Sequence, residues 1–468
     1  MQSSPRVSPP SPQTNRLIRS ALAWTLLGAT IAVTHGADYY VAVEGSDLAG
    51  GTRAQPWATV AHALTKVAPG DNVLVRGGIY RQQILMDGKA GGISGAPGKP
   101  ITVRSAPGEE ASFFLSGLMT KPEDWQPAGP NLWTTAPGSL TGYDVGCVWH
   151  DDLSSEKKWA RAELQAPWNF WYDAENKNVT VWAPANPATL ARRIEIPIGQ
   201  WMQHIVQLRN VSHMVIEDLT IKYSNTHGIQ MTEVHDVMVR NCRISHVGGA
   251  WIWADHTRFG NGVELWCDGQ DITVENCAIA WCFDTGITNQ GDKGEQARIV
   301  IRNNRITHTK CGLEHWATGS ANVRDVLYEG NTITDSGDNW AHNLQNVWGA
   351  IRLMRHHPNN VGAGQPNTGT VERFVVRGNT IERCGSLEGA QQGAAQPFAE
   401  HPSIRIIGGN FLVTDNIIRD GRSAGIFASS GFAGTIRGNT ITGGVGPALQ
   451  LKDVSPLAVV EGNSIDPP

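Results

Sequence analysis

The sequence lacks the signatures of several common kinds of site. No two of its seven cysteines stand two residues apart and the HExxH pattern is absent, so a metal site of the zinc type has little support. The odd cysteine count also lacks the spacing of a disulfide scaffold. The most apolar stretch, residues 21–33, is too short to cross a bilayer as a helix. A formal charge of -5 argues against nucleic acid or an anionic membrane as partner.

The first 37 residues predict export. Arg16 and Arg19 precede the apolar stretch, and small residues follow it up to Ala37. This order is typical of a signal peptide, so we exclude residues 1–37 from the fold and expect a secreted or periplasmic protein. The segment contains three arginines and no acid, so the formal charge of the remainder is -8.

Glycine, proline and tryptophan are abundant. The chain has 52 Gly and 25 Pro, which fits a β protein rich in turns. Its 17 Trp exceed what a core of this size needs. Flat aromatic faces suit ligands with flat apolar faces, such as sugar rings, although individual Trp side chains can equally close the ends of a stack.

One short phrase recurs through the second half of the chain. Eight copies of an apolar run end in a polar residue, one further residue and Ile, at Ile244, Ile279, Ile306, Ile333, Ile381, Ile418, Ile441 and Ile465. Two residues before these stand Cys242, Cys277, Asn304, Asn331, Asn379, Asn416, Asn439 and Asn463. A fixed position that returns every 23 to 48 residues indicates a solenoid whose coils carry insertions.

The repeating unit is a strand. Apolar and polar residues alternate over short runs bounded by Gly, Asn and Asp, and a second strand follows each Ile, often opened by Gly. This pattern predicts an all-β right-handed parallel β-helix, with a β-sandwich as the weaker alternative. Stacked Asn side chains at the strand spacing of roughly 4.8 Å would hydrogen-bond from coil to coil. Cys242 and Cys277 share this position and could pair, but we favour two buried thiols.

Three regions follow the signal segment. Residues 38–124 form an N-terminal cap and the first coils, with a short helix near WATVAHALTKV that closes the open end of the solenoid. Residues 125–203 interrupt the repeat with scattered Trp and predict a small antiparallel β insert, because YDAENKNVTVW places turn residues between two strand-like runs. Residues 204–468 contain the regular coils.

The opening region carries a family resemblance. YYVAVEGSD, PWATVAHALTKVAPGDNVLVRGGIY and KPITVRSAPGE are similar to the N-terminal cap of bacterial right-handed β-helix proteins of the pectate-lyase-like superfamily. NFWYDAENKNVTVW resembles an insert of β-helical glycoside hydrolases in that group. The superfamily includes lyases, glycosidases, epimerases and adhesins, so the resemblance implies an architecture and leaves the reaction to the side chains.

Outward-facing side chains of the second strands supply the candidate site. With Ile229, Val263, Ile287 and Leu313 as an inward stack, the next residue of each strand points outward. The resulting column is Gln230, Glu264, Thr288, Glu314, Arg352, Arg405, Phe427 and Gln450. Two residues further along lie Thr232, Trp266, Gln290, Trp316, Met354, Ile407, Ser429 and Lys452. Glu264 and Glu314 therefore share a column, and Thr288 stands between them, one coil from each.

The spacing of the two acids favours a glycosidase. Two coils at roughly 4.8 Å each separate Glu264 and Glu314 by roughly 10 Å at the backbone. Inverting glycosidases hold their carboxyls about 6.5–9.5 Å apart, so inversion fits better than retention. Asp284 is a third candidate catalytic acid. The alternative for these acids is an ordinary solvated face.

The expected substrate-binding residues surround this pair. They are Trp266, Trp316, Arg352, Arg405, His256 and Gln290. Long loops before and after two short connections would enclose a pocket over Thr288 and Glu314. These loops also contain Asp255, Arg258, Asp338, His342, Glu400 and His401. His315 alternates inward beside Asn289 and is expected to be a buried, hydrogen-bonded histidine.

The working hypothesis is an exported glycoside hydrolase that acts on a plant or algal polysaccharide or oligosaccharide, without a cofactor. A polysaccharide lyase is the first alternative. It would use Arg352 and Arg405, or Lys310, as base and charge neutraliser on a uronate, with calcium held by acids such as Glu264, Asp284 and Glu314. A non-catalytic glycan-binding or adhesin-like β-helix is the second alternative, but it would need neither paired acids nor enclosing loops.

Overall fold

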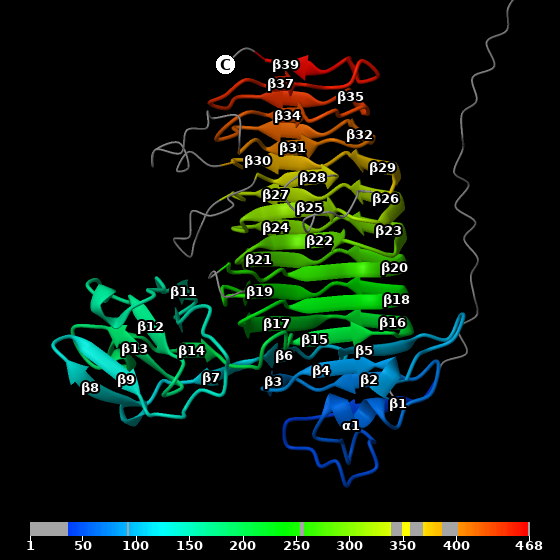
Figure 1. Ribbon diagram of the computed structural model, residues 1–468. Helices are drawn as coiled ribbons and strands as arrows, with labels where there is room; N and C mark the ends of the chain where they lie inside the picture. The colour runs from blue at the N-terminus through cyan, green and yellow to red at the C-terminus, as the bar shows by residue number, and fades with distance from the viewer. Residues whose placement is uncertain are drawn as a thin grey trace, which may run out of the picture. The chain divides into compact units, whose positions relative to one another are not determined.

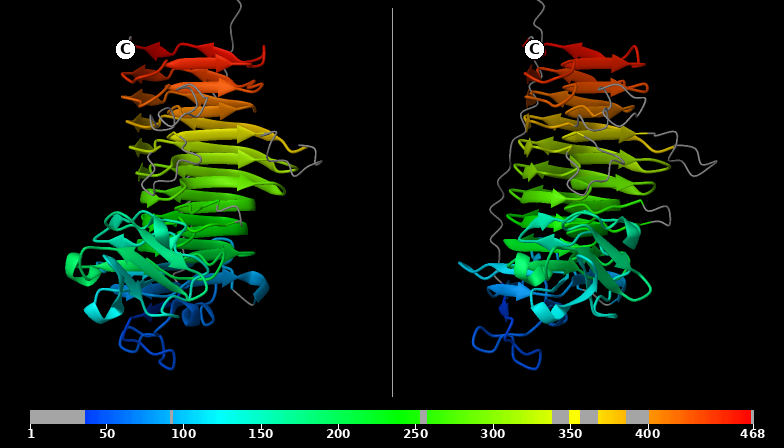
Figure 2. Two further views of the ribbon diagram at one scale, coloured as in Figure 1. Left: turned by 60° about the vertical axis from the view of Figure 1, so that its left-hand side comes forward. Right: turned by 90° about the vertical axis from the view of Figure 1, so that its left-hand side faces the viewer.

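The computed structural model describes residues 36–90, 93–252, 257–337, 349–355, 368–385 and 401–466. Its main body is a stack of coils in which each strand lies beside its counterpart in the next coil (Figures 1 and 2). The strands pair in parallel, in one 20-stranded and one 11-stranded sheet. The predicted all-β parallel β-helix is therefore confirmed. No helix in these ranges is long and apolar enough to cross a membrane.

One coil shows the plan. β22 (Thr285–Gly291) and β23 (Glu295–Arg302) belong to the larger sheet, and β24 (Arg305–Thr307) belongs to the smaller one. β22 pairs with β25 (Cys311–Ala317) of the next coil, Leu313 beside Ile287. A short turn separates each pair of strands, so every coil presents three faces.

The other coil strands follow the same order. The face of β22 contains β4 (Ile84–Asp87), β15 (Val206–Arg209), β18 (Ile229–Arg240), β20 (Val263–Glu275), β28 (Ile351–Arg355), β31 (Ile404–Ile407), β34 (Ile426–Ser429) and β37 (Leu449–Lys452). β18 and β20 run on into the face of β23, which also contains β5 (Ile101–Ser105), β16 (Ser212–Glu217), β26 (Asn322–Glu329), β29 (Val371–Arg377), β32 (Phe411–Thr414), β35 (Thr435–Arg437) and β38 (Val459–Glu461). At the N-terminal end, β1 (Asp38–Val41) pairs with β2 (Asn72–Val75), and β2 pairs with β5, so these two strands belong to the face of β23. The smaller sheet contains β3 (Gly78–Tyr80), β6 (Ala111–Phe114), β17 (Leu219–Ser224), β19 (Arg243–Val247), β21 (Ala278–Cys282), β27 (Thr332–Thr334), β30 (Thr380–Glu382), β33 (Ile417–Arg419), β36 (Thr440–Thr442) and β39 (Ser464–Ile465).

The recurrent Ile residues form one wall of the core. Ile244 pairs with Ile279, which pairs with Ile306, and the register continues to Ile465. The Ile residues from 244 to 441 are at most 2% exposed. Burial of an aliphatic side chain of this size contributes about 1.5–3 kcal/mol, so the repeated phrase supplies much of the stability of the stack.

The asparagine ladder, Asn304 to Asn463, is the second repeated feature. Asn304 Nδ2 donates to Asn331 Oδ1 at 3.0 Å, and Asn331 Nδ2 donates to Asn379 Oδ1 at 2.9 Å. Each Oδ1 also accepts the backbone N–H of the preceding ladder residue, as Asn331 Oδ1 does from Asn304 at 3.0 Å. The predicted coil-to-coil hydrogen bonding is confirmed. The side chains close the turn by replacing backbone hydrogen bonds that a turn cannot make.

The residue before each ladder position explains the rest of the phrase. Asn241, Asn276 and Asn303 have φ of 54–56°, and Gly330 and Gly378 have φ of 62–63°. Left-handed backbone of this kind disfavours most side chains but suits Gly, Asn and Asp. The first residue of each Asn–Asn, Gly–Asn or Asp–Asn pair therefore adopts the left-handed conformation that the turn requires.

All seven cysteines are buried thiols outside any disulfide. Cys242 and Cys277 occupy the ladder position in the first two of these coils, and their thiols donate to the backbone carbonyls of Arg240 and Glu275 at 3.4 Å. The favoured interpretation of two buried thiols is confirmed. The backbone N–H of Cys277 donates to Asn304 Oδ1 at 2.9 Å, which joins these coils to the asparagine ladder.

The N-terminal end is closed by α1 (Val60–Leu64), which lies at the end of the stack in Figure 1. Thr59 caps the helix by accepting the backbone N–H of His62 at 3.0 Å. Val60, Ala63 and Leu64 pack into the same apolar cluster as the coils. The helix therefore covers the apolar interior that the first coil would otherwise expose to water.

The insert contains two four-stranded antiparallel sheets, within residues 116–197. One comprises β7 (Ser116–Leu118), β10 (Trp149–His150), β11 (Leu153–Ser154) and β14 (Ile194–Pro197). The other comprises β8 (Trp125–Gly129), β9 (Leu132–Thr135), β12 (Phe170–Asp173) and β13 (Asn178–Trp182). Three short 3-10 helices, η1 (Gly88–Ala90), η2 (Pro122–Asp124) and η3 (Arg161–Glu163), and α2 (Pro187–Leu190) complete the described elements. The predicted turn between residues 173 and 178 forms the β12–β13 hairpin.

Candidate functional site

The strand register brings the two predicted acids into one column. Glu264 of β20 pairs with Thr288 of β22, and Thr288 pairs with Glu314 of β25. Arg352 of β28 and Arg405 of β31 continue the row. We call these five residues the acid column. Glu264 and Glu314 therefore stand two coils apart with Thr288 between them.

A second column lies two residues further along the same strands. Trp266, Gln290 and Trp316 are Cα partners in successive coils, and we call them the tryptophan column. The two indole rings stack at 6.2 Å between centroids, with 20° between their planes. Gln290 turns its amide toward Glu264 Oε1, which it reaches at 2.9 Å. The tryptophan column thus contributes both flat ring faces and a polar contact to the acid.

The acids are buried. The exposed fraction is 5% for Glu264 and 6% for Glu314, and Thr288 between them is 1% exposed. The alternative of a solvated face with ordinary charges is therefore wrong. Protein side chains, rather than bulk water, surround each carboxyl group.

Three N–H donors hold Glu264. Asn261 Nδ2 and Gln290 Nε2 reach Oε1 at 3.1 and 2.9 Å, and His227 Nε2 lies 3.1 Å from Oε2. These contacts fix the carboxyl group in one orientation. Each donor comes from a different coil, so the orientation depends on the stacking of the solenoid.

His227 is a neutral donor. The backbone N–H of Asn261 donates to His227 Nδ1 at 2.8 Å, which assigns the proton of the ring to Nε2, the atom facing Glu264. Burial lowers the pKa of His227 to about 3, so the ring carries no charge at neutral pH. The ring also stacks on His204 of the preceding coil at 4.6 Å.

Burial raises the pKa of Glu264 to about 8, and the charges of Asp284 and Glu314 add to the shift. The hydrogen bonds from Asn261 and Gln290 oppose it. At neutral pH the carboxyl group is therefore mostly protonated. A buried carboxylic acid with a raised pKa can donate a proton to a leaving group.

The raised pKa predicts a stability difference that needs no substrate. The wild-type protein should lose stability as pH rises from about 4.5 to about 8, because the buried carboxyl group resists a deprotonation that the unfolded chain undergoes freely. Glu264→Gln removes this loss. Its Tm relative to wild type should therefore rise between pH 4.5 and pH 8, by the equivalent of roughly 2–4 kcal/mol.

Thermal melts at the two pH values check this prediction. Glu217→Gln is the matched control, because Glu217 is equally buried but pairs with Arg240 at 2.9 Å, so the variant should gain no such advantage. A Glu264→Gln difference that stays constant with pH would contradict the raised pKa.

Glu314 has a different environment. Arg352 Nη1 donates to its Oε1 at 2.7 Å, and the hydroxyls of Thr285 and Thr288 donate to its Oε2 at 3.3 Å each. Burial raises the pKa of Glu314, but the positive charge of Arg352 opposes that rise. The pKa of Glu314 stays above its usual value, and the ion pair with Arg352 is the contact that favours the carboxylate form needed for a base.

A group of further charges lies beside the acids. Arg258 and Lys310 both lie over the ring of Phe283, at 4.4 and 4.7 Å from its centroid. Asp284, which follows in the sequence, is half-buried and interacts electrostatically with Lys310. Burial lowers the pKa of Lys310, and it lowers the pKa of Arg258 to about 10. Groups with shifted pKa values gathered in one place are characteristic of catalytic sites.

Sequence reasoning missed the residues that orient the acids. His227, Asn261 and Thr285 all immediately precede a strand-opening Gly. The Gly allows neighbouring coils to approach: a Cβ on Gly228 would lie 2.7 Å from the carbonyl oxygen of Gly262. The residue before the Gly then bonds to the next coil, as Asn261 Oδ1 does to the backbone N–H of Thr285 at 2.9 Å. The polar residue before each such Gly was the available signal.

The remaining candidates divide into two groups. Arg405 is half-buried in the acid column, and Arg258 and Lys310 lie in the charged group. His315 is buried and its Nδ1 lies 3.0 Å from Asn289 Nδ2, as expected. His256, Asp255, Asp338, His342 and Glu400 lie outside the described residues.

The three acids proposed as calcium ligands do not gather at one point. Among the described residues, the oxygens of Glu264, Asp284 and Glu314 do not form a set within 4.8 Å of one another. The ligand atoms of His213, His235 and Asp236 do lie within 4.8 Å of one another, in a mostly exposed position away from the acid column.

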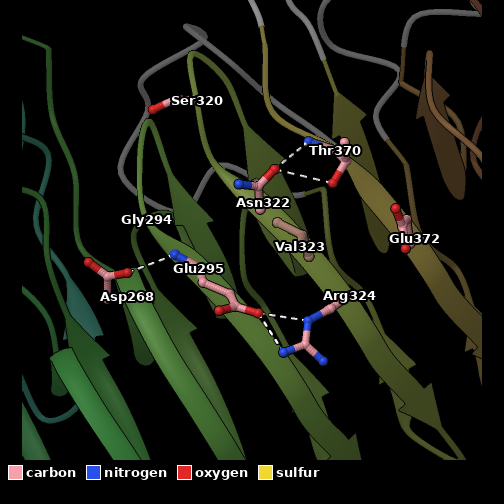
Figure 3. A pocket seen from close by; sticks show the side chains of 9 residues that line it. All are labelled: Asp268, Gly294, Glu295, Ser320, Asn322, Val323, Arg324, Thr370 and Glu372. Carbon is pink, nitrogen blue, oxygen red and sulfur yellow. Dashed lines mark hydrogen bonds and ion pairs between the residues drawn. The ribbon is translucent and has the colours of Figure 1, made fainter.

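An open hollow lies beside β20 at Asp268 and along the turns that follow β22 and β25. Its volume is about 670 Å³, and Figure 3 shows its lining from Asp268 to Glu372. Glu295 pairs with Arg324 at 2.6 Å, and its backbone N–H donates to Asp268 at 2.7 Å. Asp268 is two residues beyond Trp266 in β20, so the hollow lies further along the same strand than the tryptophan column.

Comparisons with known proteins agree with this architecture. Residues 198–346 match the family model described as "Right handed beta helix region". The fold is a right-handed parallel β-helix. A solved structure named "Glycoside hydrolase" superposes with a TM-score of 0.58 at 12% identity, covering 92% of this chain and 97% of that one. A structure named "Rhamnogalacturonan lyase" gives 0.49 at 12% identity, over 92% and 88% of the two chains.

A curated relative shares a short segment with this right-handed β-helix. The "Uncharacterized protein YwoF" of Bacillus subtilis (strain 168) is 44% identical over 81 residues, which are 17% of this chain and 16% of the relative. The match thus spans less than a fifth of the relative's length. The solved structure named "Glycoside hydrolase" shares the fold of the chain at low identity, so the choice of reaction depends on the residues described above.

Proposed function

We propose that this protein is an exported glycoside hydrolase, in which Glu264 is the general acid and Glu314 the general base. One observation carries the proposal: two buried carboxyl groups stand in one column, two coils apart, in unlike environments. Glu264 is kept protonated by burial, and Glu314 is paired with Arg352. Opposite protonation states of paired carboxyl groups are what glycoside hydrolysis requires.

In the proposed reaction, Glu264 donates its proton to the glycosidic oxygen as the bond to the anomeric carbon breaks. Glu314 accepts a proton from the water that attacks that carbon. The two-coil separation leaves room for this water and favours inversion. Asp284 raises the electrostatic cost of ionising Glu264, which helps to hold the proton until transfer. The structural neighbour named "Glycoside hydrolase" is compatible with this reaction class.

The discriminating experiment is a panel of neutral and acidic plant and algal glycans, assayed in parallel for reducing ends and for absorbance at 235 nm. Hydrolysis creates reducing ends without absorbance. Growth of absorbance on a uronate polymer would contradict the hydrolase proposal.

A uronate lyase is the second candidate, because Lys310 offers a base. Its side chain is 3% exposed and burial lowers its pKa, which increases the fraction of neutral amine. Arg258 and Arg352 would then neutralise the carboxylate of the substrate. In that case, Lys310→Met should abolish the absorbance at 235 nm.

The role of Glu264 as an acid predicts the alkaline limb of the pH profile. Activity should fall as pH rises through about 8, where Glu264 loses its proton. His227→Phe removes the N–H that stabilises the carboxylate, so the pKa should rise and the limb should move to higher pH by about one unit.

The measurement is kcat/KM from pH 5 to 10. His204→Phe is the matched control, because His204 is an equally buried ring one coil earlier and makes no contact with Glu264 that would shift the limb. An unchanged limb in His227→Phe would exclude Glu264 as the group observed.

The tryptophan column predicts a binding defect. Trp266→Ala and Trp316→Ala should raise KM by about tenfold with little change in kcat, because the rings contact substrate without taking part in proton transfer. Steady-state kinetics on the best substrate measures both parameters. Trp201→Ala, at a Trp that is 57% exposed outside both columns, should leave KM unchanged.

A further inference from the structure

A second cavity lies between the insert and the loop that leads to β20. It has a volume of about 360 Å³, at the lower end of the range for small-molecule pockets. Its lining includes Asp144, Lys157, Trp159, Trp171, Tyr172 and Trp251. None of these residues belongs to the acid column or the tryptophan column, so the cavity is a separate site.

The charged residues that line this cavity are paired. Lys157 Nζ lies 2.6 and 2.5 Å from the two carboxylate oxygens of Asp144, and both residues are at most 8% exposed. The neighbouring Lys158 pairs with Glu156 at 2.6 Å. A ligand with a net charge would leave one member of such a pair uncompensated, which is costly in a buried place. The cavity therefore suits a neutral ligand with hydroxyl groups.

Three of the four aromatic side chains that line the cavity are partly exposed. Trp159 is 41% exposed, and Trp171 and Trp251 are half-buried. Tyr172 is buried and fixed by a hydrogen bond from its hydroxyl to the carbonyl of Gly142 at 2.7 Å. Large apolar rings gathered around a polar centre match the alternation of C–H faces and hydroxyl edges on a sugar ring.

A chain of contacts connects the cavity to the acids. The backbone N–H of Trp251 donates to Asp144 Oδ2 at 3.0 Å. Arg258, in the same loop, donates to the carbonyl of Gly146 at 2.8 Å and lies over Phe283, next to Asp284. The loop then reaches Asn261, which holds Glu264. One loop thus lines the cavity at its start and orients the general acid at its end.

We propose that this cavity is a subsite for one neutral sugar unit of the glycan that the acid column cleaves. The inference rests on the proposed hydrolase function for the identity of the glycan, and on the cavity itself for the neutral sugar. Trp159 and Trp171 stack on the ring, and Asp144 and Lys157 bond to its hydroxyls. A glycan long enough to reach both places is held more tightly than a short one.

The test is calorimetric titration of the full chain carrying Glu314→Gln, which should slow turnover by about a hundredfold or more. The titrants are neutral hexasaccharides (xylo-, cello-, manno- and galacto-) and a galacturonate hexasaccharide. At least one neutral hexasaccharide should bind, and Trp159→Ala and Trp171→Ala should each weaken that binding by about tenfold or more. Trp201→Ala is the matched control and should leave it unchanged.

The outcomes separate the two proposals. Equal neutral-sugar binding in all variants, no binding by any neutral hexasaccharide, or tryptophan-dependent binding of the galacturonate alone would overturn the subsite. Tryptophan-dependent binding of a neutral sugar would support it, even if the wild-type protein cleaves no glycan. In that event only the hydrolase proposal would fail. Melting curves of each variant show that the fold is retained.

Discussion

Glu264→Gln and Glu314→Gln should each lower kcat by about a hundredfold to ten-thousandfold, the usual contribution of a general acid or base. Each change removes a proton donor or acceptor while keeping the shape of the side chain. The hydrogen bonds from Asn261 and Gln290 to Oε1 of Glu264 can persist with a Gln carbonyl in its place. The loss should therefore appear in turnover, with the fold intact.

Single-turnover and steady-state rates on the best substrate give the result. Glu217→Gln is the control, because it changes a carboxylate of equal burial in β16, outside both columns, and should cost stability with kcat unaffected. Near-normal turnover in both column variants would remove the acid column from the mechanism. Asp284→Asn would then be the next variant to measure.

Asn379→Ala should reduce the free energy of unfolding by about 2–5 kcal/mol. The Asn379 amide donates to the carbonyl of Tyr328 at 3.1 Å and to Asn416 Oδ1 at 2.9 Å, and its Oδ1 accepts two N–H groups of Asn331. Alanine leaves these groups buried without partners, and each orphaned group costs about 1–3 kcal/mol. Solvent does not reach the position, which is fully buried.

Chemical denaturation followed by far-ultraviolet circular dichroism measures the change. Asn463→Ala is the matched control, because Asn463 is half-buried at the last position of the ladder and has no further ladder residue beyond it among the described coils. Its effect should be smaller. Equal effects at the two positions would show that the ladder does not act through buried hydrogen bonds.

The repeat was predictable because its physics is local. An inward Ile, a stacking Asn and a left-handed Asn or Gly must occur together in every coil, so the phrase around Asn331 or Asn379 identifies the fold. The register followed from the same phrase. Once Ile287 and Leu313 are aligned, the next residues Thr288 and Glu314 must be neighbours.

The burial of the site was not predictable in this way. Whether Glu264 is exposed to water depends on side chains from other coils, such as His227. It also depends on how closely neighbouring coils approach at the strand-opening glycines. The sequence places His227 thirty-seven residues from Glu264, without a pattern that marks the pair. The same holds for the cavity lined by Lys157 and Trp251, since an insert and a coil loop meet there only in three dimensions.

The left-handed turn before each ladder position also bears on how such a molecule changes through evolution. Because the same Asn, Asp or Gly ends every coil, a duplicated or deleted coil meets its new neighbours with a matching surface on both sides. The stack can therefore lengthen or shorten in steps of one coil, about 4.8 Å, without a new core. Copying a segment of the gene would therefore extend the surface beside the acid column, while Glu264 and Glu314 keep their register.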